Sequence, residues 1–469
     1  MSSSPVPVAP LDLSRVGRYH VVGVGGPGMN AIALVLAGMG HDVSGSDIRD
    51  SIVVDRLRAA GVTVTIGHDR ALVHGMDAVT GSSAIPDRNI ELSEARETGV
   101  TTLRRAGMLA SICAQAKSLA VAGTHGKTTT SSMLMAILDE AGMKPSFLIG
   151  GDLNDMGTGA AWSGSEWLVV EADESDGTFL ELPLFGTIVT NIEADHLDHF
   201  GTLDAIIDGF DHYLAQIPGP KVVCADDPAA LALAHKHQAI TYGTHPDARY
   251  RIADIESQNG VVRFTLHRDG LALGSVQVPL RGTHNVRNAT AATALAMEVG
   301  ASFEAAVKAL SRFGGVARRF DFRGEHNGIT FVDDYAHIPT EIAVVLEAAA
   351  SSGDDWKRIV AVFQPNRFKR MAVLSPEYAH AFVHADLAVI TDIYPSGDAP
   401  IPGVTGKLVV DAILDSHPRQ RVAWLPHRAD LVDFLAKELR PGDVCISMGC
   451  GDVASLPSEV LAELTEGPL

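Results

Sequence analysis

The sequence begins the same pattern three times: a short apolar segment, a turn and an apolar helix. The first copy runs from Tyr19 (YHVVGVGGPGMNAIALVLAGMG), the second from Ser118 (SLAVAGTHGKTTTSSMLMAILDEAG), and the third opens with an apolar segment at 330–334. An apolar strand that turns directly into an apolar helix is typical of parallel α/β folds. The pattern therefore predicts an α/β protein with three separately started units.

The chain length agrees with this prediction. At roughly 100 to 200 residues per domain, 469 residues correspond to about three domains, which we place at 1–117, 118–317 and 318–469. Residues 249–280 alternate apolar and polar side chains around Asn259-Gly260 and Asp269-Gly270, and this predicts an antiparallel meander added to the second domain. The hydrophobic fraction of 46% is that of a chain that folds.

Charge and cysteine usage narrow the class of protein. The formal net charge of -20 opposes general attraction to nucleic acid or to an anionic membrane. The four cysteines are scattered and lack metal-ligand spacing, so we expect reduced thiols in a cytoplasmic protein. No window reaches about 18 uninterrupted apolar residues, and the first twenty residues do not resemble a secretory signal.

The first glycine turn predicts a nucleotide site. Gly23, Gly25 and Gly28 fit G-x-G-x-x-G, and Asp47 follows at the end of the next strand pattern. Such glycines let a diphosphate approach a helix N-terminus, and the acid can accept a ribose hydroxyl. Alone the motif indicates NAD or another nucleotide diphosphate. The alternative is a tight turn without a ligand.

The second turn, GTHGKTTT at 123–130, predicts a phosphate site. It supplies clustered backbone N–H groups, Lys127 for the β- and γ-phosphate charge and Thr128 for magnesium. It departs from G-x-x-x-x-G-K-[ST] because the loop is shorter and Val121 stands where a first glycine would be. An unliganded Gly-Lys turn is the alternative.

Acidic and histidine-containing segments follow two later strands, EADESD at 171–176 and NIEADHLDHF at 191–200. Carboxyl ends of parallel strands share one crevice, so Glu171 and His196 can face the same phosphates as Thr128 and hold one or two Mg²⁺ ions. A zinc pair of His196 with His199, or a solvated acidic helix start, are the alternatives.

Several later side chains have both a functional and an ordinary interpretation. Asn285 and Asn288 could read an adenine edge, or one of them could cap a helix. Arg318 and Arg319 could reach a γ-phosphate or form surface ion pairs. The ends of the third domain's strands place a further group at its crevice, namely Asp334, His337, Arg367 and Arg370.

Taken together, the motifs resemble those of a known family, the Mur ligases. The resemblance runs from Tyr19 to Asp452 and rests on GVGGPGM, SSAIPDRN, GTHGKTTT, EADESD, NIEADHLDHF, GTHNVRNA, DDYAHIPTE, FQPNRFKR and DIYPSGDAPIPG, in that order. It implies a Rossmann-like domain for a UDP sugar, a central P-loop-type ATPase domain with an added antiparallel sheet, and a Rossmann-like closing domain for the amino acid.

The resemblance also implies roles for individual residues. The UDP sugar would contact Gly25, Gly26, Gly28, Met29, Asp47, His68 and Ser83. ATP would contact Gly123, Thr124, His125, Gly126, Lys127, Thr128, Thr129, Asn285, Asn288, Arg319 and Asp334. Magnesium would be held by Thr128, Glu171 and His196, and the amino acid by His337, Arg367 and Arg370. Two positions depart from the family pattern, because Ile338 and Asn366 stand where histidines are usual.

The implied activity is ATP-dependent ligation of L-alanine to the lactyl carboxylate of UDP-N-acetylmuramate through an acyl phosphate, a step of peptidoglycan precursor synthesis. Lys127 and Arg319 would neutralise charge, and His337 would deprotonate the amine. ATP and Mg²⁺ would be the cofactors, small molecules the only substrates, and a monomer or homodimer the active form. Alternatives are a murein peptide ligase, an NAD-dependent oxidoreductase and a non-catalytic nucleotide-binding protein.

Overall fold

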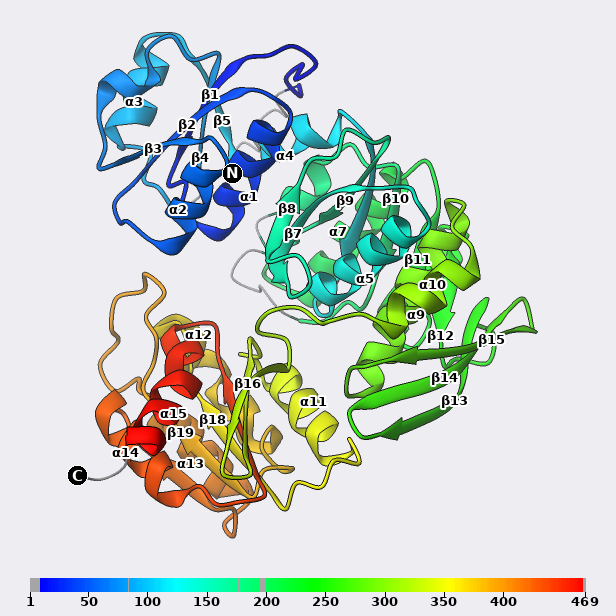
Figure 1. Ribbon diagram of the computed structural model, residues 1–469, viewed down its shortest axis with the longest axis vertical. Coiled ribbons are helices and arrows are strands. Elements are labelled where there is room, and N and C mark those ends of the chain that lie inside the picture. Colours follow the sequence, from blue (N-terminus) through cyan, green and yellow to red (C-terminus); the bar gives the residue numbers. More distant parts are fainter. Residues whose placement is uncertain (1–8, 83, 176, 195–199, 467–469) are drawn as a thin grey trace. The chain divides into compact units, whose positions relative to one another are not determined.

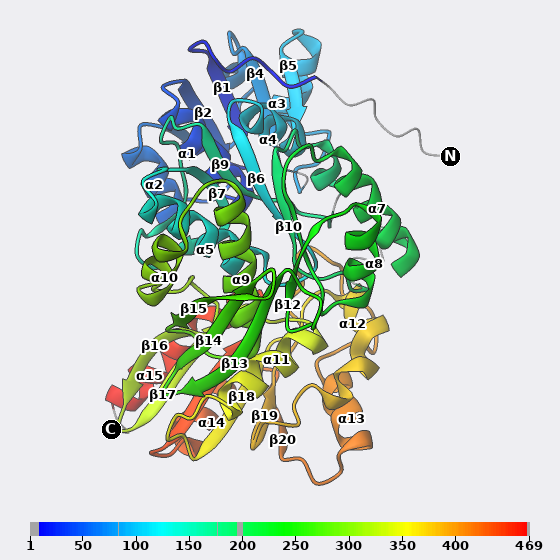
Figure 2. The same cartoon turned by 90° about the vertical axis from the view of Figure 1, so that its right-hand side faces the viewer.

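The computed structural model describes residues 9–82, 84–175, 177–194 and 200–466, and in these residues it is an α/β protein with three sheets (Figures 1 and 2). The chain forms two compact units. The first contains the described residues up to Ala253 together with 265–276 and 287–314, and the second contains 254–264, 277–286 and the described residues from 315 onward.

The first sheet has five parallel strands in the order β3-β2-β1-β4-β5. Its strands are β1 (Arg18–Val22), β2 (Asp42–Asp47), β3 (Thr63–Ile66), β4 (Ala78–Gly81) and β5 (Thr101–Arg104), and its helices are α1 (Pro27–Gly38), α2 (Ile52–Ala59), η1 (Arg70–Val73), α3 (Ile90–Glu97) and α4 (Arg105–Cys113). The strand order reverses between β1 and β4, and ligands of open α/β sheets bind at such a switch point. The predicted glycine turn leaves β1 at this point.

The second sheet has ten strands in the order β15-β14-β13-β12-β11-β10-β6-β9-β7-β8. Its central strand β6 pairs in parallel with both β9 and β10. The bounds are β6 (Lys117–Ala122), β7 (Ser146–Leu153), β8 (Thr158–Ala161), β9 (Trp167–Glu171), β10 (Gly186–Val189), β11 (Lys221–Cys224), β12 (Ile240–Gly243), β13 (Tyr250–Gln258), β14 (Val261–Arg268) and β15 (Leu271–Val278). Strand β6 corresponds to the apolar segment predicted from Ser118, which precedes the GTHGKTTT turn.

The helices connected to this sheet are α5 (Lys127–Glu140), η2 (Thr178–Glu181), α7 (Leu203–Gln216), α8 (Pro228–Lys236), α9 (Thr283–Glu298) and α10 (Phe303–Ser311). Helix α5 is buried along most of its length, including the predicted Met133, Leu134, Ile137 and Leu138. A helix that is covered on most sides keeps its first turn in a fixed place. The turn that precedes α5 is therefore held by the core.

The predicted meander corresponds to β13, β14 and β15. Asn259 and Gly260 have φ of 49° and 73°, and Asp269 and Gly270 have φ of 52° and 79°. Positive φ at both residues is what a two-residue hairpin turn requires. The antiparallel pairing of β7 with β8, in contrast, was not anticipated, because β8 reads TGAA and carries no strong strand signal.

The third sheet has six strands in the order β16-β17-β21-β18-β19-β20, with only β16 antiparallel. Its elements are β16 (Asp321–His326), β17 (Ile329–Asp334), α11 (Pro339–Ala350), β18 (Arg358–Phe363), α12 (Phe368–Leu374), η3 (Ser375–His380), β19 (Leu387–Ile390), α13 (Lys407–Ser416), β20 (Val422–Trp424), α14 (Arg428–Glu438), β21 (Asp443–Met448), η4 (Asp452–Ser455) and α15 (Leu456–Glu466). Both of its faces are covered: Ala361 and Phe363 pack on one side, and Val360 and Val362 on the other. This explains the unbroken apolar run of β18.

Within the described residues, no helix has the length and apolarity needed to cross a bilayer.

The cysteines differ in exposure, and this predicts their reactivity. Cys113, Cys224 and Cys445 are buried, and burial raises the pKa of Cys113 and of Cys445 to about 12. Cys450 is partly exposed. Because the thiolate is the reactive form and must be reached by the reagent, we expect an aromatic disulfide reagent at about pH 8 to modify Cys450 first. The Cys450→Ser variant should lose the fast phase of absorbance change, and a fast phase that persists in that variant would contradict the burial pattern.

Candidate functional site

The phosphate-type loop lies between the end of β6 and the start of α5, and its two glycines are required by geometry. Gly123 has φ of 120° and Gly126 has φ of 80°. A Cβ at Gly123 would lie 2.9 Å from Asn191 O, and one at Gly126 would lie 2.7 Å from Asn288 Oδ1. A side chain at either position would therefore be strained and would collide with its neighbours. The sequence GTHG folds into a loop that only these glycines permit.

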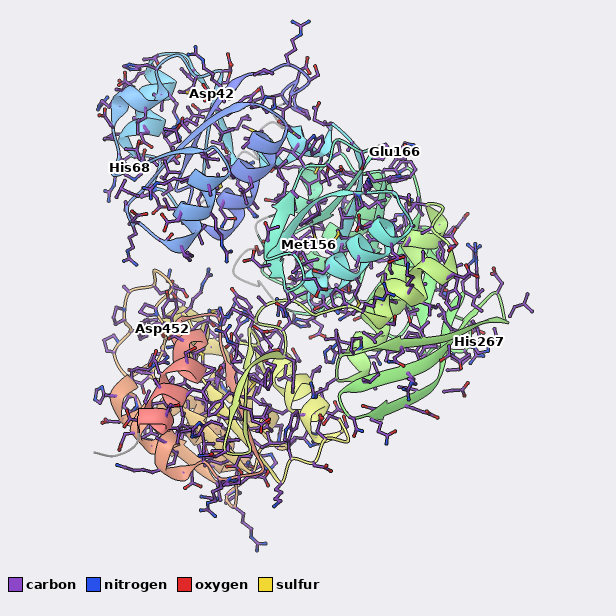
Figure 3. All side chains as sticks on the ribbon, viewed as in Figure 1. Asp42, His68, Met156, Glu166, His267 and Asp452 are labelled. Carbon is purple, nitrogen blue, oxygen red and sulfur yellow. The ribbon has the colours of Figure 1, made fainter. Side chains whose placement is uncertain are left out.

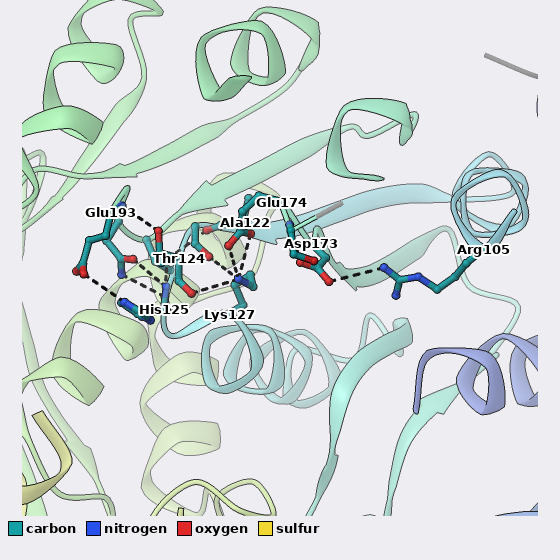
Figure 4. Close-up of polar contacts among 12 residues, drawn as sticks. Arg105, Ala122, Thr124, His125, Lys127, Asp173, Glu174 and Glu193 are labelled. Atoms are coloured by element: carbon teal, nitrogen blue, oxygen red, sulfur yellow. Dashed lines mark hydrogen bonds and ion pairs between the residues drawn. The ribbon is translucent and has the colours of Figure 1, made fainter. Parts of the chain in front are cut away.

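Residues that follow β10 fix this loop (Figure 4). The N–H groups of Thr124 and His125 donate to Asn191, at 3.1 Å to O and 2.8 Å to Oδ1. In return, Thr124 Oγ1 accepts from Glu193 N at 2.9 Å, and His125 Nε2 lies 3.3 Å from Glu193 Oε2. In this conformation the predicted ATP contacts Thr124 and His125 direct their backbone N–H groups to Asn191.

Lys127 is the buried cation of this loop. Its Nζ donates to Gly123 O at 2.7 Å and Thr124 O at 3.2 Å, and to the two carboxylate oxygens of Glu174 at 2.9 and 3.0 Å. Burial lowers the pKa of Lys127, but the charges of Glu174, Asp173 and Glu171 outweigh burial and raise the pKa above its ordinary value. The ammonium is therefore protonated at neutral pH. Its three protons are shared among four acceptors, so a bound phosphate would have to replace one of them.

Three carboxylates gather where β9 ends. The pairing of Val121 with Glu171 places Glu171 beside the end of β6. Burial raises the pKa of Asp173, but the charge of Lys127 and hydrogen bonds from Ser175 outweigh it and lower the pKa. Asp173 Oδ2 also lies 3.7 Å from Arg105 Nη2 (Figure 4). Residues Glu171, Asp173 and Glu174 thus form a local anionic patch balanced by Lys127 and Arg105.

The predicted magnesium ligands are only partly described. Thr128 lies in the first turn of α5, with 8% of its surface exposed, and Glu171 ends the neighbouring strand β9. His196 and His199 lie outside the described residues. Within the described part of the chain, no three His, Cys, Asp or Glu side chains are arranged to hold a metal ion. A hydroxyl and a carboxylate beside a phosphate loop are nevertheless oxygen donors of the kind that Mg²⁺ takes together with phosphate oxygens and water.

In the first domain, the glycine turn is tied to Asp47. Gly25 N donates to Asp47 Oδ2 at 2.9 Å, so the acid at the end of β2 holds the loop that follows β1. Gly28 faces Arg105, because a Cβ there would lie 3.0 Å from Arg105 Nη1. Met29 is 1% exposed and packs into the core, so a ligand would meet its backbone and not its side chain. Ser83 lies outside the described residues.

His68 follows β3 and belongs to a buried polar network that sequence analysis did not identify. Its Nδ1 lies 3.3 Å from Oε1 of Glu91, a carboxylate with 0% exposure. Glu91 is in the first turn of α3, where an acidic residue is usual and carries no signal of its own. The fold places Glu91, in the first turn of α3, beside His68, which follows β3.

Two asparagines lie one turn apart on α9. The helix begins at Thr283, so neither Asn285 nor Asn288 is its N-cap. Asn285 Nδ2 donates to Arg281 O at 2.7 Å, and the side chains are nearly buried, with 6% and 7% exposure. The amide of Asn288 lies against Gly126 of the phosphate loop. Reading of an adenine edge by these residues stays a prediction.

The two adjacent arginines at the start of the third domain differ. Arg318 Nε donates to Asp333 Oδ2 at 3.0 Å, and Arg318 Nη2 donates to Gly449 O at 2.5 Å. Both guanidinium groups lie over the Tyr335 ring, at 5.0 and 5.1 Å from its centroid, so the difference lies in the hydrogen bonds of Arg318. Arg318 therefore anchors the sheet, and Arg319 is the better candidate for a phosphate contact.

Asp334 ends β17 and is held in the interior. It accepts hydrogen bonds from Phe320 N and Ala336 N, both at 2.7 Å. Burial raises its pKa to about 6, although Arg319 and these two N–H groups oppose the shift. A carboxyl with such a pKa is mostly ionised at neutral pH, and a cation or a hydrogen-bond donor of a ligand would lower that pKa.

The predicted amino-acid site lies at the ends of β17 and β18. His337 Nδ1 lies 3.2 Å from Glu341 Oε2, and Tyr378 Oη donates to His337 O at 2.7 Å. Arg370 Nη1 donates to Asn366 Oδ1 at 3.3 Å. Asn366, which stands where a histidine is usual in the family, thus accepts this hydrogen bond from Arg370.

Ile338 is the other departure from the family pattern. It is 7% exposed and stands at the N-cap of α11 without a capping hydrogen bond. Its place in the fold is therefore an apolar one.

Three family models match the chain in succession. "Mur ligase family, catalytic domain" matches residues 18–117, "Mur ligase middle domain" matches 121–296, and "Mur ligase, glutamate ligase domain" matches 318–451. Together they span most of the chain.

Full-length relatives and structures are similar as well. UDP-N-acetylmuramate--L-alanine ligases of Bradyrhizobium sp. (strain ORS 278) and Pelotomaculum thermopropionicum are 44% and 41% identical, over 96% and 97% of this chain and 98% and 99% of theirs. The structure of the Thermotoga maritima UDP-N-acetylmuramate-alanine ligase MurC has a TM-score of 0.81 and 26% identity, covering 96% of this chain and 99% of that one. A murein peptide ligase from Psychrobacter arcticus has a TM-score of 0.68 and 26% identity, covering 97% and 100%.

The burial of the Lys127–Glu174 pair makes a prediction about stability. The Glu174 side chain is 3% exposed, whereas the surface pair Lys117–Glu166 has side chains 52% and 62% exposed. Removal of one partner from a buried charged hydrogen bond should lower the free energy of unfolding by about 1.5 to 3 kcal/mol, and a surface pair contributes about 0 to 1 kcal/mol. We expect Glu174→Gln to destabilise the protein clearly more than Glu166→Gln in urea denaturation. Equal losses in the two variants would contradict the buried pairing.

Proposed function

Because the chain belongs to the Mur ligase family, we propose that it joins L-alanine to the lactyl carboxylate of UDP-N-acetylmuramate while ATP is converted to ADP and phosphate. The observation that carries this proposal is the full-length similarity to ligases of that name, which extends across all three sheets. The order of the motifs, from the first glycine turn to DIYPSGDAPIPG, supports it.

The first step activates the acid. A carboxylate is a poor electrophile, so one of its oxygens attacks the γ-phosphorus of ATP, the bond to the β-phosphate oxygen breaks, and an acyl phosphate and ADP result. Two anions must meet, and Lys127 and Arg319 lower their repulsion. Thr128 and Glu171 would hold Mg²⁺, with His196 as the further ligand, and the ion would add charge neutralisation at the phosphates.

The second step forms the amide. The amine of alanine, once deprotonated, attacks the acyl carbon, and phosphate leaves from the tetrahedral intermediate. His337 serves as the base, and its contact with Glu341 orients the ring and stabilises a positive charge on it. Arg367 and Arg370 receive the α-carboxylate, because a guanidinium matches a carboxylate in shape and charge.

The domain roles follow the sheets. We assign 1–117 to the UDP sugar, 118–317 to ATP and 318–469 to the amino acid, in a cytoplasmic enzyme that acts as a monomer or homodimer. NAD-dependent oxidation is not favoured, because it leaves the Gly123–Thr130 loop without a role. The remaining alternative is a ligase that takes a preformed peptide in place of L-alanine.

The direct test is ADP release by the purified protein with ATP, Mg²⁺ and UDP-N-acetylmuramate. We expect release to depend on L-alanine, with a preformed peptide in place of L-alanine giving less than about a tenth of that rate. Lys127→Ala should lose about 10²- to 10³-fold or more in kcat, because it removes an electrostatic donor at the transferred phosphoryl group. Faster ADP release with the peptide, or near-normal turnover in the variant, would overturn the proposal.

The arginines of the third domain predict the behaviour toward alanine. Arg367→Ala and Arg370→Ala should each lower kcat/KM for L-alanine by a factor of tens, since a charge-assisted contact is worth about 1.5 to 3 kcal/mol. The KM values for ATP and UDP-N-acetylmuramate should stay almost unchanged. Acyl phosphate should still form and be trapped by hydroxylamine. Unchanged alanine kinetics in both variants would place the carboxylate site elsewhere.

A further inference from the structure

A buried carboxylate in the first domain lies outside every role assigned above. Glu91 is in the first turn of α3, and Asn89 caps that helix by accepting from Glu91 N at 2.9 Å. Both Glu91 and its neighbour Ser46 have 0% exposure. A buried charge is costly unless it is hydrogen-bonded, so its contacts indicate what it does.

The contacts of Glu91 connect the two segments that carry the predicted nucleotide ligands. Its Oε2 accepts from Ser46 Oγ at 2.6 Å, directly before Asp47 at the end of β2. Its Oε1 accepts from Asp69 N at 3.0 Å, directly after His68. Burial raises the pKa of Glu91, but hydrogen bonds from His20, Ser46 and Asp69 N outweigh burial and lower it. The carboxylate is therefore ionised and acts only as an acceptor.

This network fixes which ring nitrogen of His68 carries the proton. Nδ1 lies 3.3 Å from Glu91 Oε1 and 3.3 Å from Ser46 Oγ. The Ser46 hydroxyl already donates its proton to Glu91, so both neighbours of Nδ1 are acceptors. Nδ1 must then be the donor, and in the neutral ring Nε2 is left as a bare acceptor.

The position of this acceptor is that of a ligand site. Gly67 N donates to Asp47 O at 2.8 Å, so His68 and Asp47 lie next to each other at the carboxyl edge of β2 and β3. His68 is labelled on the first domain in Figure 3. Its side chain remains 20% exposed, whereas the side chain of Glu91 has 0% exposure. One end of the ring is fixed in the interior and part of the ring is open to a ligand.

We propose that Glu91 is a positioning residue that holds His68 with Nε2 as a hydrogen-bond acceptor for an O–H or N–H group of the nucleoside in the UDP sugar. This inference rests on the proposed function, which supplies the ligand. The nucleoside offers two kinds of donor, the ribose hydroxyls and the imide N–H of uracil. Selection comes from the network, because a ring with the opposite tautomer would present an N–H donor, which the imide N–H cannot accept and which a ribose hydroxyl could meet only by accepting.

Glu91→Gln tests the network with kinetics. The glutamine side chain presents an NH₂ group where a hydrogen-bond donor now points at the Glu91 carboxylate. The His68 ring is then no longer held with Nε2 as an acceptor. Outer-shell partners of this kind change affinity by about 10- to 100-fold in metal sites, and we expect KM for UDP-N-acetylmuramate to rise about tenfold with kcat and KM for ATP within about twofold. The matched control is Glu94→Gln on the same helix, whose carboxylate pairs at the surface with Arg70 and His74. Equal rises in KM for both substrates would overturn the proposal.

A spectroscopic measurement keeps the test independent of the stability of that variant. In the full chain with ¹⁵N-histidine, and with His68→Asn for assignment, His68 of the wild type should show a protonated Nδ1 and an unprotonated Nε2 at neutral pH. The Glu91→Gln variant should show a mixture of tautomers, and Glu94→Gln the wild-type pattern. A protonated Nε2 in the wild-type protein would overturn the proposal by itself.

Ligand analogues separate the two donors. Calorimetry measures the affinities of the wild-type protein and of Glu91→Gln for UDP, 2′-deoxy-UDP, 3′-deoxy-UDP and N3-methyl-UDP. The analogue that lacks the group bound by His68 Nε2 should bind the wild type about tenfold more weakly than UDP does. In Glu91→Gln, that analogue and UDP should bind with nearly the same affinity, because the contact is already lost. Identical losses for all analogues in the two proteins would overturn the role of His68 Nε2. Failure of the proposed function looks different, because the wild-type protein would then bind no UDP and release no ADP with UDP-N-acetylmuramate.

Discussion

The buried ammonium of Lys127 is the interaction on which the central domain depends. Two glycines with positive φ bring backbone carbonyls to it, and Glu174 supplies the countercharge from the end of the neighbouring strand. Each part constrains the others: a side chain at Gly123 or Gly126 would move the loop, and loss of Glu174 would leave a buried cation underbalanced. The site is thus a balance of charges that exists before any nucleotide binds, and a phosphate would enter it by exchange with an existing acceptor.

The same placement recurs in each of the three sheets. Polar side chains stand at the carboxyl ends of parallel strands: Asp47 ends β2, Glu171 ends β9 and Asp334 ends β17. In open sheets of this kind, the carboxyl ends of the strands are the places where charged groups can meet ligands. A reaction that needs a sugar nucleotide, ATP and an amino acid suits a chain with three such edges.

Local patterns predicted much of this architecture, because strands, glycine turns and helix starts are encoded by neighbours in sequence. The loop before Lys127 was predicted from its residue types, and the meander from its alternation and its Asn-Gly and Asp-Gly turns. Pairings between distant residues were not predicted. The sequence around Glu91 is that of an ordinary acidic residue at a helix start, and only the fold brings Glu91 to Ser46 and His68. Strands β8 and β16 lie at sheet edges, and their pairing depends on the strands beside them. The difference between Arg318 and Arg319 likewise comes from the contacts of Arg318 with Asp333 and Gly449, which no spacing rule identifies.

The central claim is that the sites assemble an acyl phosphate from the carboxylate of the sugar nucleotide. The measurement that tests it most directly uses UDP-N-acetylmuramate with ¹⁸O in both oxygens of its lactyl carboxylate, followed by mass analysis of the phosphate released during ligation. Transfer of the γ-phosphoryl group to a carboxylate oxygen, and then cleavage of the carbon–oxygen bond by the amine, leaves one labelled oxygen in the phosphate. The account predicts that labelled phosphate forms in step with the amide product. Phosphate without ¹⁸O, with the oxygen lost from the carboxylate found in water, would contradict it.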